Sequence, residues 1–246
     1  MPRAVIRHFA LLAEASVALA EEIIDLAAAA LTARGLCTLA LAGGATPRML
    51  YARLAEEGCR QRIDWARLHL FWGDERWVAP DHADSNYRLV RESVLDHVAL
   101  PAANCHPIST AGSSPQADAS RYEREIARFF GQHGLLVAGW PCFDLILLGM
   151  GEDGHVASLF PGDPILDEGT RLVAAVYPPA GVCPSVERLT MTLPLINRAR
   201  SLRLLLAGRP KAELLHTLEE SGPAGLPVAL LAPREPAVLY LAEETR

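Results

Sequence analysis

The chain repeats one local pattern: a short run of mostly apolar residues stops at a glycine, and in most cases a segment with helical periodicity follows. The clearest runs cover residues 36–42, 67–72, 143–149 and 202–207. Strands that are apolar along their length, without polar alternation, are typical of a sheet covered by helices on both sides. The pattern therefore predicts an α/β fold, with a doubly wound, mostly parallel sheet and helices on both faces.

Between residues 9 and 33 apolar side chains recur at steps of three and four residues, which predicts a helix with one buried face. Further helices are predicted at 85–98, 117–130 and 211–218, and further strands at 172–177, 228–231 and 237–241. The loops rich in Pro, Gly and Ser are short, and none resembles a linker between domains. We expect one domain that spans residues 1–246.

The charge balance limits the classes of ligand. With 23 basic and 29 acidic residues the net charge is −6, and no basic tract suits a nucleic acid or an anionic membrane. Five widely spaced cysteines favour neither disulfides nor a zinc site. Glu14 interrupts the first apolar stretch, which argues against a signal peptide, and no uncharged run reaches the roughly 18 residues of a membrane span. We expect a cytoplasmic protein with a small-molecule ligand; the oligomeric state stays open.

Four predicted strands are followed by segments that combine glycine with charged or polar residues. These segments are 43–47, 73–76, 149–155 and 208–211. Ligands of doubly wound sheets bind beyond the carboxyl ends of the strands, so we expect the four segments to meet at one edge. The first and last also open helices, whose free N–H groups favour anions. In the first, Gly43 and Gly44 predict a tight turn, Thr46 an N-cap and Pro47 the first helical residue.

The segment from Gly149 to His155 places an acid and a histidine directly after a buried strand. His155 can act as a general acid or base near neutral pH, with Asp153 orienting its ring. The alternative is a helix N-terminus that Asp153 caps, with His155 in solvent. The residues alone leave both interpretations open.

Two basic residues are candidate ligands for an anion. Arg76, with Asp74 and Glu75 beside it, can bind a phosphate or carboxylate with its guanidinium; the alternative is a surface turn in which Arg76 pairs with a neighbouring carboxylate. Lys211 is the only lysine in the sequence, and a compact ammonium suits a phosphate.

Ser85 is expected to cap the helix predicted at 85–98.

Several common catalytic motifs do not account for these residues. The Gly43-Gly44 turn lacks the G-x-G-x-x-G pattern of a dinucleotide-binding loop, and the chain has no G-x-x-x-x-G-K-[ST] loop for a nucleoside triphosphate. It also lacks the G-x-S-x-G elbow of serine hydrolases and the H-E-x-x-H motif of metalloproteases. Binding of a dinucleotide or a nucleoside triphosphate therefore lacks its usual sequence support.

Three long motifs carry a family resemblance. They are LAGGATP at 41–47, FWGDERWVAPDHADSNY at 71–87 and FDLILLGMGEDGHVASLFPG at 143–162. In this order they resemble the 6-phosphogluconolactonase family, part of the glucosamine/galactosamine-6-phosphate isomerase superfamily. Arg188-Leu189-Thr190, Asn197 and the turn at 208–211 also fit, so the resemblance spans nearly the whole chain.

The resemblance implies a Rossmann-like sheet of the deaminase/lactonase type. It also implies hydrolysis of 6-phospho-D-glucono-1,5-lactone to 6-phospho-D-gluconate, the second step of the oxidative pentose phosphate pathway, without cofactor or metal. Carried over by motif, His155 is the acid/base residue, Asp153 supports it, and Arg76 and Lys211 bind the phosphate. The substrate-binding set implied in full is Gly43, Gly44, Thr46, Asp74, Arg76 and Lys211.

Some residues differ from the pattern of the lactonase family, and others distinguish it from alternative functions. Ala42 and Ala45 stand where the family often has serine, which removes two possible hydroxyl contacts. A related alternative is a glucosamine-6-phosphate deaminase or isomerase, but Arg76 stands in place of a deaminase-like tyrosine, and residues 157–161 differ from a Phe-Asn-Glu run. A second is a non-catalytic sugar-phosphate sensor, for which the chain offers no obvious effector module.

Overall fold

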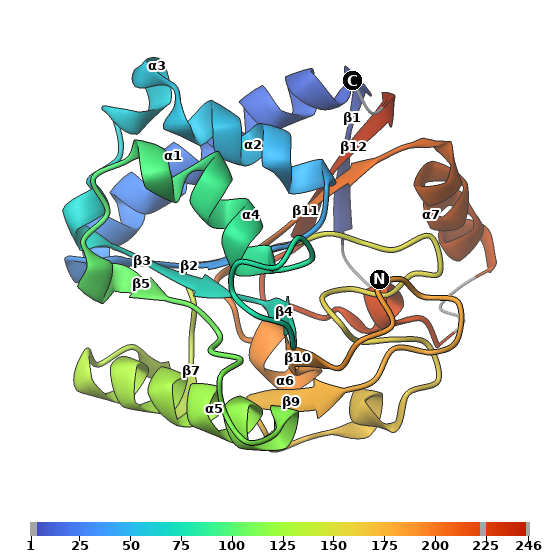
Figure 1. The fold of residues 1–246 in the computed structure, drawn as a ribbon. Coiled ribbons are helices and arrows are strands. Elements are labelled where there is room, and N and C mark those ends of the chain that lie inside the picture. Colours follow the sequence, from blue (N-terminus) through green and yellow to red (C-terminus); the bar gives the residue numbers. More distant parts are fainter. Residues whose placement is uncertain (1–3, 222–224, 245–246) are drawn as a thin grey trace.

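The computed structural model describes residues 4–221 and 225–244 (Figure 1). Its centre is a seven-stranded sheet in the order β1-β12-β11-β8-β2-β3-β5, in which every neighbouring pair is parallel. The strands are β1 Ala4–Leu11, β2 Cys37–Leu41, β3 Leu68–Trp72, β5 Cys105–His106, β8 Leu145–Leu148, β11 Ser201–Ala207 and β12 Ala237–Glu244. The predicted doubly wound α/β fold is confirmed.

Helices cover both faces of this sheet, with α1, α2 and α4 on one side and α5 on the other (Figure 1). The helices are α1 Leu12–Arg34, α2 Thr46–Ala55, α3 Glu57–Arg60, α4 Asn86–Ser93, α5 Pro115–Gln132, α6 Leu193–Ile196 and α7 Arg209–Ser221. Short 3-10 turns lie at Trp65–Arg67, Leu95–His97, Ala102–Asn104, Pro164–Asp167 and Pro227–Leu230. Because helices pack on both faces, central strands such as β2 and β8 are buried along their whole length.

A second, antiparallel sheet has the order β4-β10-β9. Its strands are β4 Asp74–Arg76, β10 Arg188–Met191 and β9 Val173–Val176, and a separate hairpin joins β6 Leu136–Val137 to β7 Trp140–Pro141. The register pairs Arg76 with Arg188 and Asp74 with Thr190. Since β4 follows β3 after only Gly73, the small sheet begins at the carboxyl end of the large one.

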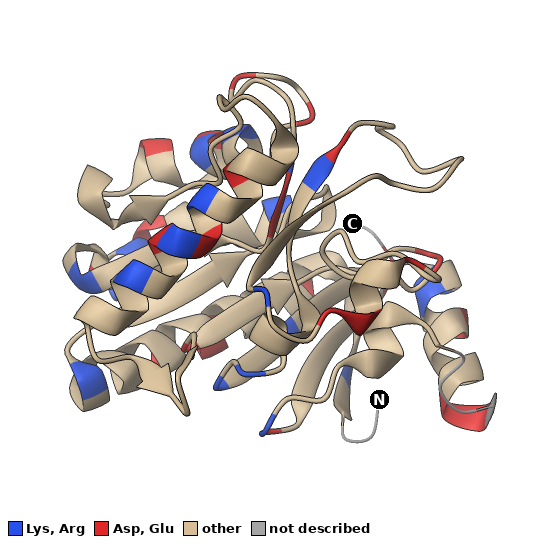
Figure 2. Ribbon diagram, turned by 90° about the horizontal axis from the view of Figure 1, so that it is seen from below, with Lys and Arg blue, Asp and Glu red and all other residues tan. Residues whose placement is uncertain are grey.

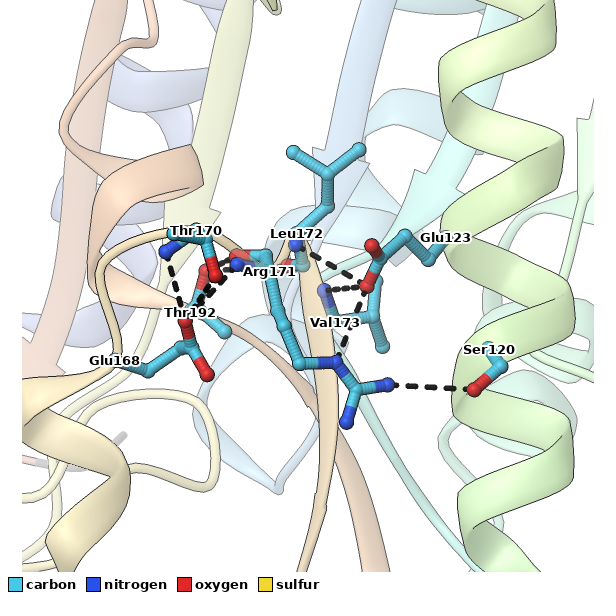
Figure 3. Close-up of polar contacts among 8 residues, drawn as sticks. All are labelled: Ser120, Glu123, Glu168, Thr170, Arg171, Leu172, Val173 and Thr192. Carbon is cyan, nitrogen blue, oxygen red and sulfur yellow. Dashed lines mark hydrogen bonds and ion pairs between the residues drawn. The ribbon is translucent and has the colours of Figure 1, made fainter.

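Helix α5 covers the open edge of β9, as Figure 3 shows. The Glu123 carboxylate accepts the backbone N–H groups of Leu172 and Val173, at 3.2 and 3.3 Å. Arg171 extends from the adjoining loop, with its Nε 3.6 Å from Glu123 and its Nη2 3.3 Å from the Ser120 hydroxyl. One acidic side chain therefore satisfies two edge amides that a further strand would otherwise bind.

Several predicted elements differ from the structure. Residues 9–11 belong to an unpredicted edge strand, β1, and not to the first helix. Six of the eight side chains of β1 are exposed, so it lacked the continuous apolar pattern of the other strands. The apolar run at 228–231 forms a 3-10 turn, Pro227–Leu230, and the strand at 172–177 belongs to the small sheet.

Two helix ends also need correction. Thr46 is the first residue of α2, and the N-cap is Ala45, which supplies no side-chain hydrogen bond. The helix predicted at 85–98 ends at Ser93, where Val94 leaves helical geometry and a 3-10 turn follows. Its predicted cap is confirmed, because the Ser85 hydroxyl accepts the Arg88 N–H at 3.2 Å.

The surface charges are mixed. Figure 2 shows basic and acidic residues interspersed along the helices. Within the described residues, no helix is both long enough and apolar enough to span a membrane.

Candidate active site

The four glycine-containing segments meet at the carboxyl edge of the sheet, as predicted, and line one cavity of about 280 Å³. It lies beyond β2, β3, β8 and β11, with the small sheet as a further wall. Its lining is formed by Ala42, Gly43, Gly44, Ala45, Thr46, Pro47, Gly73, Asp74, Arg76, Asn86, Leu148, Gly149, Met150, Gly151, His155, Ala157, Arg188 and Lys211. Three basic side chains and one carboxylate are among them, so the cavity suits an anionic ligand.

His155 and Asp153 form a hydrogen-bonded pair. Nδ1 of His155 lies 2.6 Å from Oδ1 of Asp153, which also accepts the His155 backbone N–H at 3.1 Å. The carboxylate can accept only, so we assign the Nδ1 proton to His155, which leaves Nε2 with a free lone pair. No described residue hydrogen-bonds Nε2, and the side chain, 24% exposed, lines the cavity.

The turn that holds this pair is not a helix N-terminus, so that alternative is wrong. Residues 149–154 match G-x-G-x-x-G, a match that the sequence analysis overlooked, but no helix follows them, as a dinucleotide-binding loop requires. Gly151 has a different role. A Cβ on Gly151 would lie 2.2 Å from the His155 ring and 2.5 Å from Oδ1 of Asp153, so only glycine fits beneath the pair.

The turn before α2 presents backbone donors to the cavity. Gly44 has φ +90°, which glycine adopts without strain. The N–H groups of Gly43, Gly44 and Thr46 bond to no acceptor in the described part of the chain, and all three residues line the cavity. They are suited to an anion or to sugar hydroxyl groups.

Asp74 and Asn86 form a buried support beside this turn. One Asp74 oxygen accepts the Ser158 hydroxyl at 2.7 Å, and the other accepts Nδ2 of Asn86 at 3.2 Å. Asn86 packs so closely against Gly43 that a Cβ on that glycine would lie 1.8 Å from Oδ1 of Asn86. Asp74 thus lines the cavity with both carboxylate oxygens already bonded to protein.

Glu75 points to the opposite side of β4 from Asp74 and Arg76, toward the start of α4. Its carboxylate accepts the backbone N–H groups of Arg76, Asn86 and Tyr87, each at 2.7 Å, and the Ser85 hydroxyl at 3.1 Å. Burial raises the Glu75 pKa to about 7, although these hydrogen bonds oppose the shift. Glu75 therefore fixes the position of the cavity wall without lining the cavity.

Arg76 and Lys211 both line the cavity, as predicted. Arg76 donates from Nη1 to the Asp84 carbonyl at 2.7 Å, and it forms no ion pair with a described carboxylate, so the surface-turn alternative is wrong. Burial lowers the Lys211 pKa, and nearby Glu152 opposes this shift. Lys211 likewise forms no ion pair with a described carboxylate, and Glu152 acts on it only through its charge. Both cations are therefore available to a ligand.

The potential metal ligands are dispersed. Among the residues that the structure describes, no group of three or more His, Cys, Asp or Glu side chains is arranged to hold a metal ion.

Comparison with known proteins identifies the family. A family model described as glucosamine-6-phosphate isomerases/6-phosphogluconolactonase matches residues 12–240. The chain belongs to this family. It is 45% identical to a 6-phosphogluconolactonase from Synechocystis sp. over 218 residues, 87% of this chain and 85% of the relative. A Nostoc sp. 6-phosphogluconolactonase is 39% identical, covering 76% of this chain and 72% of the relative.

Solved structures of the same family have the same fold. The 6-phosphogluconolactonase from Thermotoga maritima is 29% identical, with a TM-score of 0.83 over 98% of this chain and 100% of its own. The enzyme from Trypanosoma cruzi is 30% identical, with a TM-score of 0.84 over 98% and 94%. A monomeric glucosamine-6-phosphate deaminase, 20% identical, has a TM-score of 0.79 over 97% of each chain, which shows a shared fold alone.

Within this family fold, the sequence analysis assigned no role to Arg188. Arg188 is 3% exposed and lines the cavity from β10. Its guanidinium lies over Phe160, 5.5 Å from the ring centre, and the same ring is 5.0 Å from the His155 ring. A charged residue within the buried Arg188–Met191 segment was the available signal, but the strand itself was not predicted.

Proposed function

We propose that this chain hydrolyses 6-phospho-D-glucono-1,5-lactone to 6-phospho-D-gluconate in the oxidative pentose phosphate pathway. The observation that carries the proposal is the cavity that joins the His155–Asp153 pair to three cations. It supplies a general base and an anion-binding wall, which are the two features that a phosphorylated lactone needs. The 6-phosphogluconolactonase relatives support the same reaction.

In this mechanism Nε2 of His155 takes a proton from a water molecule, and the water oxygen attacks the lactone carbonyl carbon, C1. The tetrahedral oxyanion then collapses, and the bond between C1 and the ring oxygen breaks. The His155 imidazolium returns its proton to the departing ring oxygen, so no net proton stays on the enzyme. General acid–base catalysis of this kind contributes about 10²- to 10⁴-fold. The steps use no cofactor or metal.

Asp153 keeps the His155 ring in the required tautomer and stabilises the imidazolium that forms during attack. The N–H groups of Gly43, Gly44 and Thr46 lie free at the cavity and can stabilise the oxyanion or bind the sugar hydroxyl groups.

The phosphate binds to Arg76 and Lys211 in this proposal. An anchored phosphate holds C1 in one place, which turns attack by a positioned water into an effectively intramolecular step. Asp74 lines the same cavity, but both of its oxygens are bonded to Asn86 and Ser158, so its part is to hold the wall and not to bind an anion. In this proposal the protein therefore recognises the substrate by its phosphate, and the reaction takes place at the lactone carbonyl.

A glucosamine-6-phosphate deaminase is the second candidate, because the matching family model includes isomerases and a deaminase has the same fold. The discriminating experiment gives the purified protein freshly generated 6-phosphogluconolactone, with spontaneous hydrolysis subtracted, and in parallel glucosamine 6-phosphate, with ammonia release measured. We expect acceleration of lactone hydrolysis and no ammonia. Ammonia release without lactone hydrolysis would replace the lactonase proposal by the deaminase one.

A further inference from the structure

Arg76 and Arg188 lie directly opposite each other on neighbouring antiparallel strands. Side chains at paired positions project to the same face, about 5 Å apart at Cβ. Like charges placed in this way repel, and a sheet normally avoids the arrangement or puts a carboxylate between the charges. Burial and, after it, the Arg76 charge lower the Arg188 pKa, and the charges of Asp74 and Asp84 oppose this shift.

No described carboxylate forms an ion pair with either guanidinium. Arg76 donates to the Asp84 carbonyl, and Arg188 donates from Nη2 to the Pro184 carbonyl at 3.1 Å. Nε of both arginines is buried and bonds to no described residue. Each guanidinium has five N–H donors, of which one bonds to a described carbonyl, and both residues line the cavity.

We propose that Arg76 and Arg188 together form a clamp for the phosphate of the sugar-phosphate ligand, with Arg188 as a phosphate-binding residue in its own right. The inference rests on the proposed function, which supplies a phosphorylated substrate. A phosphate dianion lies between the two cations, replaces their repulsion by attraction and accepts hydrogen bonds from both planar forks. Two cross-strand arginines on a rigid sheet are pre-organised for this one ligand group.

The position of Phe160 supports the same placement. The centre of its ring lies 5.5 Å from Cζ of Arg188 and 5.0 Å from the centre of the His155 ring. One aromatic side chain therefore lies next to both the phosphate clamp and the general base. Phe160 is 1% exposed, so this arrangement does not depend on a mobile surface group.

The test compares two variants. Arg188→Met keeps the apolar part of the side chain and removes the charge, whereas Arg188→Lys keeps a positive charge and removes the planar guanidinium. Arg171→Met is the matched control, since it removes one positive charge beside β9, where Figure 3 shows the side chain directed at α5. Calorimetry at pH 8, where the phosphate is a dianion, gives the Kd of 6-phosphogluconate. Sorbitol 6-phosphate, which has no carboxylate, identifies the phosphate as the group that is bound.

We expect Arg188→Met to weaken both phosphorylated ligands by about 10- to 100-fold, the effect of losing a charge-assisted hydrogen bond. Arg188→Lys weakens them less, and Arg171→Met leaves both affinities within about twofold of wild type. A folded Arg188→Met protein with wild-type affinity would overturn the inference. If that variant does not fold, Arg188→Lys decides: a fall of about tenfold supports the clamp, and wild-type affinity overturns it.

The double variant Arg76→Met/Arg188→Met tests whether the two residues share one phosphate. Losses of affinity that are not additive support a shared phosphate, and strictly additive losses contradict it.

The binding and activity results also distinguish failure of the inference from failure of the proposed function. If the protein hydrolyses the lactone but binds the phosphorylated ligands equally well without Arg188, only the clamp is refuted. If binding depends on Arg188 but the protein does not hydrolyse the lactone, only the lactonase reaction is refuted.

Discussion

The functional state of His155 depends on its own short turn. Asp153 accepts hydrogen bonds from both the ring and the backbone of His155, and the Gly151 N–H donates to the His155 carbonyl at 2.9 Å. Gly151 has no side chain because the imidazole and the carboxylate occupy that space. The glycines of this segment are therefore as necessary to the geometry as the two polar residues are.

Gly151→Ala tests this point. The added Cβ must displace the ring or the carboxylate, and a misplacement of about 1 Å lowers kcat by about 100-fold. Gly131→Ala in α5 is the control, because a Cβ there meets no atom within 4 Å. We expect kcat for lactone hydrolysis to fall in the first variant and to stay at the wild-type value in the second. Equal kcat values in both variants would refute the steric argument.

At the residue scale, the sequence motifs predicted that His155, Asp153, Arg76 and Lys211 lie at one site, because each follows a recognisable strand. The His155–Asp153 contact was also predictable, since the two residues are two positions apart. Arg188 was not assigned, because its importance comes from a cross-strand pairing with Arg76 that no local pattern reveals.

At the element scale, Glu75 joins β4 to the first turn of α4. It accepts three backbone N–H groups and one hydroxyl while it is 2% exposed. The wall that carries Arg76 therefore depends on a carboxylate whose ionised form is disfavoured by burial.

This burial predicts a pH dependence of stability. Because the folded pKa of Glu75, about 7, lies above the ordinary 4.5, its favourable contribution is complete below pH 4.5 and is lost as the pH rises through 7. Urea unfolding of wild type and Glu75→Gln at pH 5 and pH 8 measures it. The free energy of unfolding of wild type, relative to the variant, falls by up to about 3 kcal/mol between these values. A difference that is constant or grows with pH contradicts the assignment.

The edge of β9 gives a second prediction at this scale. Glu123→Ala removes the acceptor of two edge amides and lowers the free energy of unfolding by about 1–3 kcal/mol. Arg171→Met, which leaves that acceptor in place, has a smaller effect. Hydrogen exchange gives the local readout: the Leu172 and Val173 amides exchange faster in Glu123→Ala. Unchanged protection of both amides would show that α5 does not hold this edge through Glu123.

The element-scale errors of sequence prediction have one physical origin. Strands that are buried along their whole length, such as β2 and β8, have a mostly apolar sequence that by itself predicts a strand. The edge strand β1 is mostly exposed and is defined by its pairing with β12. The apolar run ending at Leu231 was mistaken for a strand because burial alone does not distinguish a strand from a turn.

At the scale of the whole molecule, the parallel sheet brings four distant segments together at its carboxyl edge, and the small sheet adds the wall with Arg76 and Arg188. The alternation of apolar runs and helices left the edge strands β1 and β5 unpredicted but made the five inner strands of the large sheet predictable. The small antiparallel sheet was not, because its strands are three or four residues long and pair only in the folded chain. The complete cavity is therefore a property of the tertiary structure.

The most direct test of the central claim is the rate of 6-phosphogluconolactone hydrolysis by wild type and His155→Ala, with spontaneous hydrolysis subtracted and 6-phosphogluconate affinity measured for both. We predict that wild type accelerates the reaction, and that the variant binds the product with similar affinity but loses at least about 100-fold in kcat. Wild-type turnover by the variant would contradict the role of His155. A folded wild-type protein that does not accelerate hydrolysis would contradict the lactonase proposal itself.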